Sequence, residues 1–204
     1  SADVLHHIEA HDKITEEGLT RHAEVWSVAW HPSNKSVASA SEDKTIRIWN
    51  LDPTGAAAPA LRTTLRGYTM AVTSLDWQQC SPAVAKSENV LVSCSDDHHV
   101  RVFDGESLTL IHNFCTDHLV PGWHTLTYLA LDAQANSLAV ATQNGFVVVW
   151  NLVDSECLAA FRIHWGSIEG LAWDPDTGKI ATCSGDHTVS LFQLTPQPPP
   201  LSVA

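Results

Sequence analysis

The sequence has few basic residues for its length. Its 204 residues include 11 Lys and Arg against 23 Asp and Glu, which gives a formal net charge of −12 with neutral histidines. Surfaces that bind nucleic acid are usually built from clustered Lys and Arg. Here the basic residues are scattered along the chain. We therefore expect no direct nucleic-acid partner.

Long apolar runs and paired cysteines are also lacking. No apolar stretch reaches the roughly 18 residues of a membrane span, and the first residues contain no apolar signal-peptide core. The five cysteines include no Cys-x-x-Cys pair. Two of them, Cys94 and Cys183, recur at one position of expected strands, where a thiol behaves as a small buried apolar group. These features predict reduced cysteines, no membrane association and a cytoplasmic and/or nuclear location.

What the sequence does contain is a segment that recurs four times. The copies are VASASEDKTIRIW, VSCSDDHHVRVF, VATQNGFVVVW and TCSGDHTVSLF. They end in the aromatic residues Trp49, Phe103, Trp150 and Phe192, at intervals of 54, 47 and 42 residues. A period in this range is typical of β-propellers and solenoids, in which a small sheet buries its apolar faces only against its neighbours.

Each repeat has the pattern of a small antiparallel sheet. An apolar run comes first, and its four copies cover 25–30, 72–77, 126–131 and 168–173. A run of small and apolar residues follows, then a polar turn and a β-branched run, which together predict a hairpin. A fourth, weaker run follows three of the repeats, in LRTTL, LTLIHNF and CLAAFRI. The sequence therefore predicts an all-β fold of four-stranded antiparallel units.

These units resemble the blades of the WD-repeat (WD40) β-propeller family over about residues 4–195. A blade of that family begins with Gly-His, carries a Ser and an Asp around its central hairpin and ends near Trp-Asp. The matching residues are His22, Ser39, Asp43 and Trp49 in the first repeat, Ser93 and Asp97 in the second and Asp186 in the fourth. The third repeat holds Val140 and Asn144 where Ser and Asp are expected. The resemblance implies that the matching side chains form a structural hydrogen-bond network within each blade.

The resemblance also implies a domain organisation. We expect one propeller domain over residues 1–195 and a Pro-rich tail over 196–204. The expected blades cover 22–65, 66–114, 118–163 and 164–195, with residues 4–8 closing the last blade as its outer strand. Since family members have about seven blades, four visible blades predict a partial ring, or one completed by a partner, rather than a closed four-blade ring. The acidic segment 12–17, before the first blade, is expected to be a solvated loop.

The set His22, Ser39 and Asp43 contains the residue types of a hydrolytic triad. A triad is expected once in a chain, whereas degraded versions of this set occur in every repeat. We therefore interpret the set as structural and expect no catalytic residue and no enzymatic activity.

Twelve histidines are present, including the adjacent pairs His6-His7 and His98-His99. Neighbouring residues on a strand point to opposite faces, so neither pair converges readily on one ion. The restriction relaxes for His98-His99 if they lie in a turn. The sequence has no recognisable metal-ligand spacing. We expect no metal ion and no cofactor.

The resemblance implies partner-contacting positions just before each first strand, at its second residue, and just before the turn Asp. In this chain the expected partner-binding residues are Glu24, Trp26, Glu42, Thr73, Asp96, Thr127, Gln143 and Glu169. The set has four carboxylates, one Trp and no Lys or Arg, which favours a basic peptide or helix. In the alternative interpretation, Trp26 belongs to the core and the acidic residues only solvate the rim.

The family resemblance implies a non-enzymatic scaffold for protein–protein interaction, a subunit of a larger eukaryotic multiprotein complex. The segment Ala10-His11-Asp12 together with 25–30 is also similar to the WD-repeat subunit of the Ski complex. An alternative function is the specific reading of a short basic or modified peptide, such as a histone tail or a degron, at the channel mouth. Trp26 is the aromatic candidate for that role.

Overall fold

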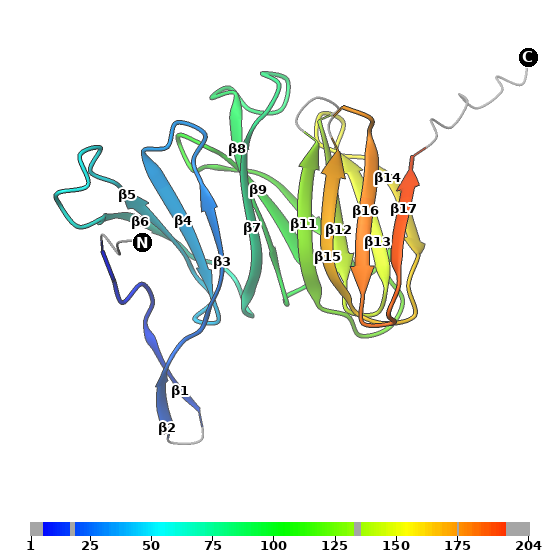
Figure 1. Cartoon of the computed structure of the whole chain (residues 1–204), viewed down its shortest axis with the longest axis horizontal. Helices are drawn as coiled ribbons and strands as arrows, with labels where there is room; N and C mark the ends of the chain where they lie inside the picture. Colours follow the sequence, from blue (N-terminus) through cyan, green and yellow to red (C-terminus); the bar gives the residue numbers. More distant parts are fainter. Residues whose placement is uncertain (1–5, 17–18, 133–135, 175, 195–204) are drawn as a thin grey trace, which may run out of the picture.

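The computed structural model describes residues 6–16, 19–132, 136–174 and 176–194. This part of the chain is all β and consists of four antiparallel sheets set side by side, preceded by a hairpin (Figure 1). The sheets are blades 1 to 4, as expected for a propeller, and they form an open arc rather than a closed ring.

The strands of each blade follow one another in sequence and pair with their neighbours. Blade 1 consists of β3 (Val25–Trp30), β4 (Ser36–Ser41), β5 (Ile46–Asn50) and β6 (Ala60–Leu65). Blade 2 consists of β7 (Val72–Gln79), β8 (Asn89–Ser95), β9 (His99–Asp104) and β10 (Leu110–Cys115), and blade 3 of β11 (Leu126–Asp132), β12 (Ser137–Thr142), β13 (Phe146–Asn151) and β14 (Cys157–Arg162). Blade 4 consists of β15 (Ile168–Asp174), β16 (Lys179–Ser184) and β17 (Val189–Gln193).

The inner strands β3, β7, β11 and β15 are the apolar first runs of the repeats. They line up along the inside of the arc, since β3 contacts β7, β7 contacts β11 and β11 contacts β15. Each inner strand has a register shift near its start, for example between Val72 and Ser74 where β7 pairs with β8. Such a bulge re-aims the side chains beside it, and here it lies at the end of the strand that carries the candidate site.

The core lies between neighbouring blades rather than inside one sheet. One cluster joins blades 1 and 2 and includes Ile48 and Trp77; a second joins blades 2 and 3 and includes Val92 and Leu129; a third joins blades 3 and 4 and includes Val149 and Ile168. The strand β8 shows the effect most clearly, because all seven of its residues are buried. A strand that is covered on both faces is expected to be apolar or small throughout.

The central hairpins turn through a left-handed residue at the same place in each blade. These residues are Lys44, His98, Gly145 and His187, with φ between 64° and 85°. In blades 1, 2 and 4 the preceding Asp accepts from the backbone N–H two residues on, as Asp43 does from Thr45. This Asx turn explains why the repeats keep a polar residue there.

Two expectations for the first residues need correction or fall outside the described part. The segment 12–17 is not a solvated loop, because β1 (Lys13–Glu16) pairs with β2 (Leu19–His22) as a hairpin. Residues 6–8 form no strand, and residues 4 and 5 of the expected closing strand lie outside the described residues. The expected Pro-rich tail, 196–204, also lies outside them.

The cysteines behave differently from one another. Cys94 is fully buried, and burial raises the pKa of its thiol to about 12. Its counterpart Cys183 was expected to be buried as well, but it is exposed. Cys183 is exposed because, among the described residues, no further blade packs on the face of blade 4 that carries it.

Candidate functional site

Blade 1 contains the expected hydrogen-bond network, with a different histidine. The Trp49 indole Nε1 donates to Ser39 Oγ at 3.0 Å, and the same hydroxyl lies 2.8 Å from His11 Nε2. On its other side, His11 Nδ1 lies 2.9 Å from Asp43 Oδ2. Burial lowers the pKa of His11, although its bond to Asp43 acts in the opposite direction. Ser39 is only 4% exposed, so its hydroxyl is a link between strands and is not open to a substrate.

The prediction of His22 in this network is wrong. His22 is exposed at the end of β2, in the hairpin that stands between His11 and blade 1. In blade 4, which has no such hairpin, His164 comes only four residues before β15 and makes the equivalent bonds to Asp186 and Thr182. Because the hairpin of β1 and β2 is inserted between His11 and β3, the network histidine lies further from the first strand of its blade than the sequence pattern predicts.

Replacing His11 by Ala tests this assignment. We expect the free energy of unfolding to fall by about 2 kcal/mol, because Ser39 and Asp43 each lose a buried hydrogen-bond partner. His22→Ala is the matched control and should change it by no more than about 0.5 kcal/mol, since that side chain is exposed. Urea unfolding followed by circular dichroism measures both, and equal losses in the two variants would contradict the assignment.

The other blades replace parts of this network. In blade 2 the Tyr68 hydroxyl takes the place of the imidazole and lies 2.8 Å from Ser93 Oγ. Asp97 accepts from the Thr69 backbone and pairs with Arg101 at 2.9 Å. In blade 3, Asn144 accepts from Thr142 Oγ1 at 2.6 Å and donates through Nδ2 to the Pro121 carbonyl at 3.1 Å. The network therefore ties the central hairpin to the preceding segment in every blade, whichever side chains provide the bonds.

A cavity of about 380 Å³ lies where the inner strands of all four blades approach one another. It contains six of the eight predicted partner-binding positions: Trp26, Thr73, Asp96, Thr127, Gln143 and Glu169. Trp26 is 43% exposed here, so it does not belong to the core. Tyr128, which is 40% exposed, also lines the cavity and was missed because it lies one residue beyond the predicted position.

Some of these side chains already have structural bonds. The Thr73 hydroxyl donates to the Leu126 carbonyl at 2.6 Å, and the Thr127 hydroxyl donates to the Ile168 carbonyl at 2.8 Å. These two hydroxyl groups therefore form hydrogen bonds from blade 2 to blade 3 and from blade 3 to blade 4. Gln143 Oε1 accepts from Thr125 Oγ1 at 3.2 Å, so the polar groups left to meet a ligand are mainly the carboxylates of Asp96 and Glu169.

Asp96 is the most distinctive acid of the cavity. Burial raises the pKa of its carboxyl group against the opposing effect of His98, and the negative charge of Asp97 acts in the same direction as burial. Its Oδ1 atom is buried and has no hydrogen-bond partner among the residues that the structure describes. A buried carboxylate oxygen without a partner is costly, which agrees with the raised pKa of this group.

The remaining two predicted positions lie beside the cavity. Glu24 Oε2 accepts from the Trp26 indole at 3.1 Å and so holds the ring at the cavity wall. Glu42 receives two bonds from the Arg21 guanidinium, at 2.6 and 2.5 Å, which lower the pKa of this carboxyl. Arg21 comes from β2, so the hairpin brings to this rim a positive charge that the sequence pattern did not reveal.

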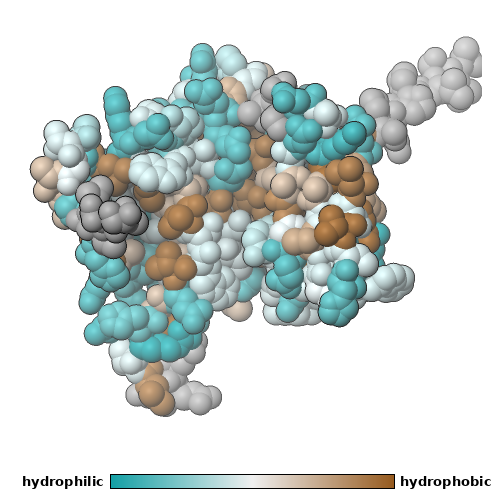
Figure 2. Space-filling model, viewed as in Figure 1, coloured by the Kyte–Doolittle hydropathy of each residue, from teal (hydrophilic) through white to brown (hydrophobic). Residues whose placement is uncertain are grey.

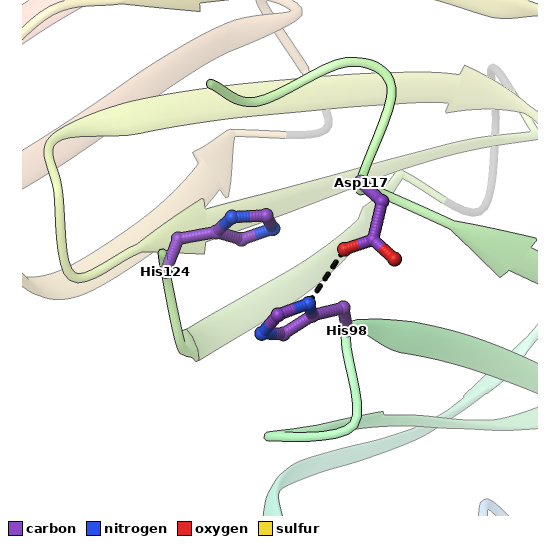
Figure 3. A group of neighbouring side chains, drawn as sticks. All are labelled: His98, Asp117 and His124. Atoms are coloured by element: carbon purple, nitrogen blue, oxygen red, sulfur yellow. Dashed lines mark hydrogen bonds and ion pairs between the residues drawn. The ribbon is translucent and has the colours of Figure 1, made fainter. Parts of the chain in front are cut away.

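A separate group of side chains lies between blades 2 and 3, where His98, Asp117 and His124 have their ligand atoms within 4.8 Å of one another (Figure 3). His98 Nδ1 lies 2.6 Å from Asp117 Oδ1, and this bond lowers the pKa of Asp117. The two imidazoles are stacked, with centroids 4.5 Å apart and planes only 19° apart. Nearly parallel rings cannot aim their in-plane lone pairs at one ion. In addition, His124 already bonds Thr116 and Gly122, so the geometry favours a hydrogen-bonded cluster over a metal centre.

The family described as "WD domain, G-beta repeat" matches residues 12–50, 60–104 and 155–193. The chain belongs to the WD40 repeat family. The matched ranges correspond to blades 1, 2 and 4, and the third repeat, with Val140 and Asn144 at the motif positions, falls outside them. The structure nevertheless folds that WD40 repeat as a four-stranded blade.

Curated relatives share the WD40 repeats over most of the chain. The nuclear distribution protein PAC1 of Arthroderma benhamiae is 28% identical over 184 residues, covering 87% of this chain and 37% of that protein. The target of rapamycin complex subunit wat1 of Schizosaccharomyces pombe is 25% identical over 190 residues, covering 88% and 53%. The chain thus spans about a third to a half of these relatives. The expected similarity to the Ski subunit finds no support in these matches.

The fold is also found among solved structures. The computationally designed Ika4 protein superposes with a TM-score of 0.65 at 18% identity, over 86% of this chain and 94% of that one. At this identity the likeness concerns the fold alone. No helix in the described part of the chain is long and apolar enough to cross a membrane.

Proposed function

We propose that this chain is a non-enzymatic interaction scaffold that binds a basic segment of a partner protein in the cavity at the inner strands. The observation that carries the proposal is the chemistry of the cavity wall: it has two carboxylates, Asp96 and Glu169, and no Lys or Arg. Two of the relatives support the role of a scaffold, since wat1 is by name a subunit of a complex and PAC1 shares the same repeats.

The charge of the cavity decides what kind of partner fits. The chain as a whole is acidic, which steers basic segments toward it and repels nucleic acid. Lys or Arg side chains in the cavity would be attracted by the carboxylate groups of Asp96 and Glu169. The exposed indole of Trp26 lies on the same wall and offers an apolar anchor next to the charge, which is a common arrangement in protein interfaces. We place such a scaffold in the cytoplasm or the nucleus.

A second candidate function is the reading of a modified basic side chain. Two aromatic residues, Trp26 and Tyr128, line the same cavity as Asp96 and Glu169. Aromatic faces next to carboxylates attract quaternary ammonium groups such as methylated lysine through cation–π contacts. Tyr128, absent from the positions predicted from the sequence, is the observation that favours this candidate.

Binding of a fluorescently labelled Lys- and Arg-rich peptide tests the proposal by anisotropy. We expect the double variant Asp96→Asn, Glu169→Gln to bind at least about tenfold more weakly, because both carboxylates are removed from the cavity wall. Glu156→Gln is the matched control, since it removes a carboxylate from the exposed turn before β14, outside the cavity. Repeating the titration with a trimethyl-lysine peptide separates the two candidate functions.

The pH dependence gives an independent check. Because burial raises the pKa of Asp96, this group takes up its proton at a higher pH than an ordinary aspartate. Peptide binding should therefore weaken as the pH falls, beginning above the usual aspartate range, and Asp96→Asn should remove that part of the dependence. Equal binding by the wild type, the double variant and the control would refute the proposal.

A further inference from the structure

A second cavity, of about 530 Å³, lies at the junction of blades 1 and 2. Blade 1 contributes the turn from β3 to β4, the end of β5 and part of β6, and blade 2 contributes the turn between β9 and β10. Both walls therefore belong to blades that pack on each other within the chain. We call this site the junction cavity.

The junction cavity lies at the opposite end of the strands from the cavity at the inner strands. Trp26, which lines the cavity at the inner strands, is the second residue of β3, whereas His31, which lines the junction cavity, follows the last residue of β3. The turn from β3 to β4 and the hairpin of β1 and β2 accordingly lie at opposite ends of blade 1 (Figure 1). Figure 2 shows hydrophilic residues over the turn end of blades 1 and 2, whereas apolar residues gather nearer the middle of the view. A ligand in one cavity therefore leaves the other open.

Two basic residues, Lys35 and Arg62, line the junction cavity. Both are exposed, and neither forms an ion pair within the part of the chain that the structure describes. By contrast, three other basic residues are each paired with a carboxylate: Arg21, Arg47 and Arg101. Acidic residues outnumber basic ones by 23 to 11 in this chain. Two unpaired basic side chains in one cavity therefore set it apart from the acidic surface around it.

A buried histidine in the cavity wall marks a place where an anionic oxygen fits. The Nδ1 atom of His31 accepts from the Ser33 backbone N–H at 3.0 Å, so the neutral imidazole carries its hydrogen on Nε2. This Nε2 atom is buried and has no hydrogen-bond partner among the described residues. Glu106 Oε1 lies 3.2 Å from it, outside the geometry of a hydrogen bond. The donor thus faces a carboxylate but stays unsatisfied, which is costly for a buried group.

Glu106 is the one carboxylate among the described residues that line this cavity, and it covers His31 Nε2. Its side chain is 58% exposed, so it has room to rotate away. Its backbone carbonyl accepts from Arg62 Nη2 at 2.7 Å, which holds the turn against blade 1 whatever the side chain does. Two basic side chains and one carboxylate leave one positive charge in excess, and outward rotation of Glu106 adds the His31 donor to the site.

We propose that the junction cavity binds an anionic side chain of a partner protein, a carboxylate or a phosphate group. Lys35 and Arg62 provide the charge, since lysine and arginine are the usual partners of both groups. The volume exceeds that of one such group, and Leu51 and Pro53 line the same cavity and offer apolar contact to neighbouring residues of the segment. The inference goes beyond the proposed function, because a scaffold with an acidic cavity at one end and a basic cavity at the other can hold two partners of opposite charge.

Three fluorescently labelled peptides test the proposal by anisotropy. They share one sequence with neutral flanking residues and carry serine, glutamate or phosphoserine at the central position. We expect at least one of the two anionic peptides to bind at least about tenfold more tightly than the serine peptide, and the stronger of the two identifies the group that the cavity takes. Equal binding of all three peptides, or a preference for a labelled oligonucleotide over the peptides, would overturn the proposal.

Substitution of the basic pair locates the binding. The double variant Lys35→Gln, Arg62→Gln should bind the anionic peptide at least about tenfold more weakly. Lys44→Gln, Arg66→Gln is the matched control, because it removes the same residue types and the same charge outside the cavity, at the other end of blade 1. All four side chains are exposed, so unchanged circular dichroism is expected for both variants. Equal losses in the two would mean that net charge alone attracts the peptide, and would contradict the site.

Glu106→Ala gives a result that general destabilisation cannot produce. It removes the competing charge and uncovers His31, so the anionic peptide should bind at least about threefold more tightly. Glu156→Ala is the matched control, since Glu156 is also exposed in a turn before the outer strand of its blade but lies outside the cavity. Weaker binding by Glu106→Ala would show that its carboxylate belongs to the structure of the site, and would contradict the proposal.

The two cavities are tested independently of each other. Lys35→Gln, Arg62→Gln should bind the Lys- and Arg-rich peptide no more weakly than the wild type, and Asp96→Asn, Glu169→Gln should bind the anionic peptide no more weakly. Loss of both kinds of binding in either variant would contradict two separate sites. Failure of the anionic peptides alone would refute the junction cavity as a site and leave the proposed function standing.

Discussion

Trp77→Ala is expected to reduce the free energy of unfolding by about 3–5 kcal/mol. The ring is 4% exposed in the core cluster between blades 1 and 2. Its Nε1 donates to Asn89 Oδ1 at 3.1 Å, and its ring meets His31 edge to face with centroids 4.6 Å apart. Truncation leaves a large void and an unpaired buried amide oxygen, and the core cluster shared by blades 1 and 2 loses an aromatic side chain. Urea unfolding followed by circular dichroism measures the effect.

Trp123→Ala is the control for Trp77. Trp123 is 74% exposed in the connection between blades 2 and 3, so its loss should change the unfolding free energy by no more than about 0.5 kcal/mol. A small effect at Trp77 would mean that the blades do not pack as the structure has them.

Gly145→Ala should destabilise the chain by about 3 kcal/mol. Gly145 turns the central hairpin of blade 3 with a φ of 85°, and a Cβ atom there would lie 2.0 Å from the His164 carbonyl oxygen. The Gly145 carbonyl in turn accepts from the backbone N–H groups of Ile163 and His164. The substitution would therefore push the segment that leads into blade 4 away from blade 3.

Gly122→Ala separates the clash from the cost of the backbone conformation. Gly122 also has a positive φ, of 77°, but no atom lies within 4 Å of the position of its Cβ. Only the left-handed backbone is then unfavourable, which costs about 1 kcal/mol. Thermal unfolding of both variants checks the difference, and equal losses would show that the close approach at Gly145 does not limit stability.

The repeat period made most of the fold predictable. The strands that follow the period are those whose burial dictates composition, as in β8, where every residue is covered. The hairpin of β1 and β2 escaped prediction because all four described residues of β2 are exposed. Without a buried face, its sequence has no apolar alternation that would mark a strand.

The sequence predicted those residues of the candidate site that occupy the same position in every repeat. The second residue of each inner strand lines the cavity in every blade, as at Trp26 and Glu169. What could not be predicted depends on segments that do not repeat. His11 replaces His22 in the network, and Arg21 reaches Glu42, because the inserted hairpin folds back on blade 1. Such long-range contacts leave no local pattern in the sequence.

In three of the inner strands, the first two residues have different roles, one in packing and one in the cavity. The first residue of β7, β11 and β15 (Val72, Leu126 and Ile168) is fully buried between blades, whereas the next residue faces the cavity. The register shift at the start of each inner strand sets the second residue apart from its buried neighbour, so a mutation at the second position changes the chemistry of the cavity without disturbing the packing of the first. The threonines of blades 2 and 3 are constrained by their bonds to the next blade, but Trp26 and Glu169 are free to diverge. New partner preferences can therefore evolve on an unchanged framework, beginning at the first and last blades.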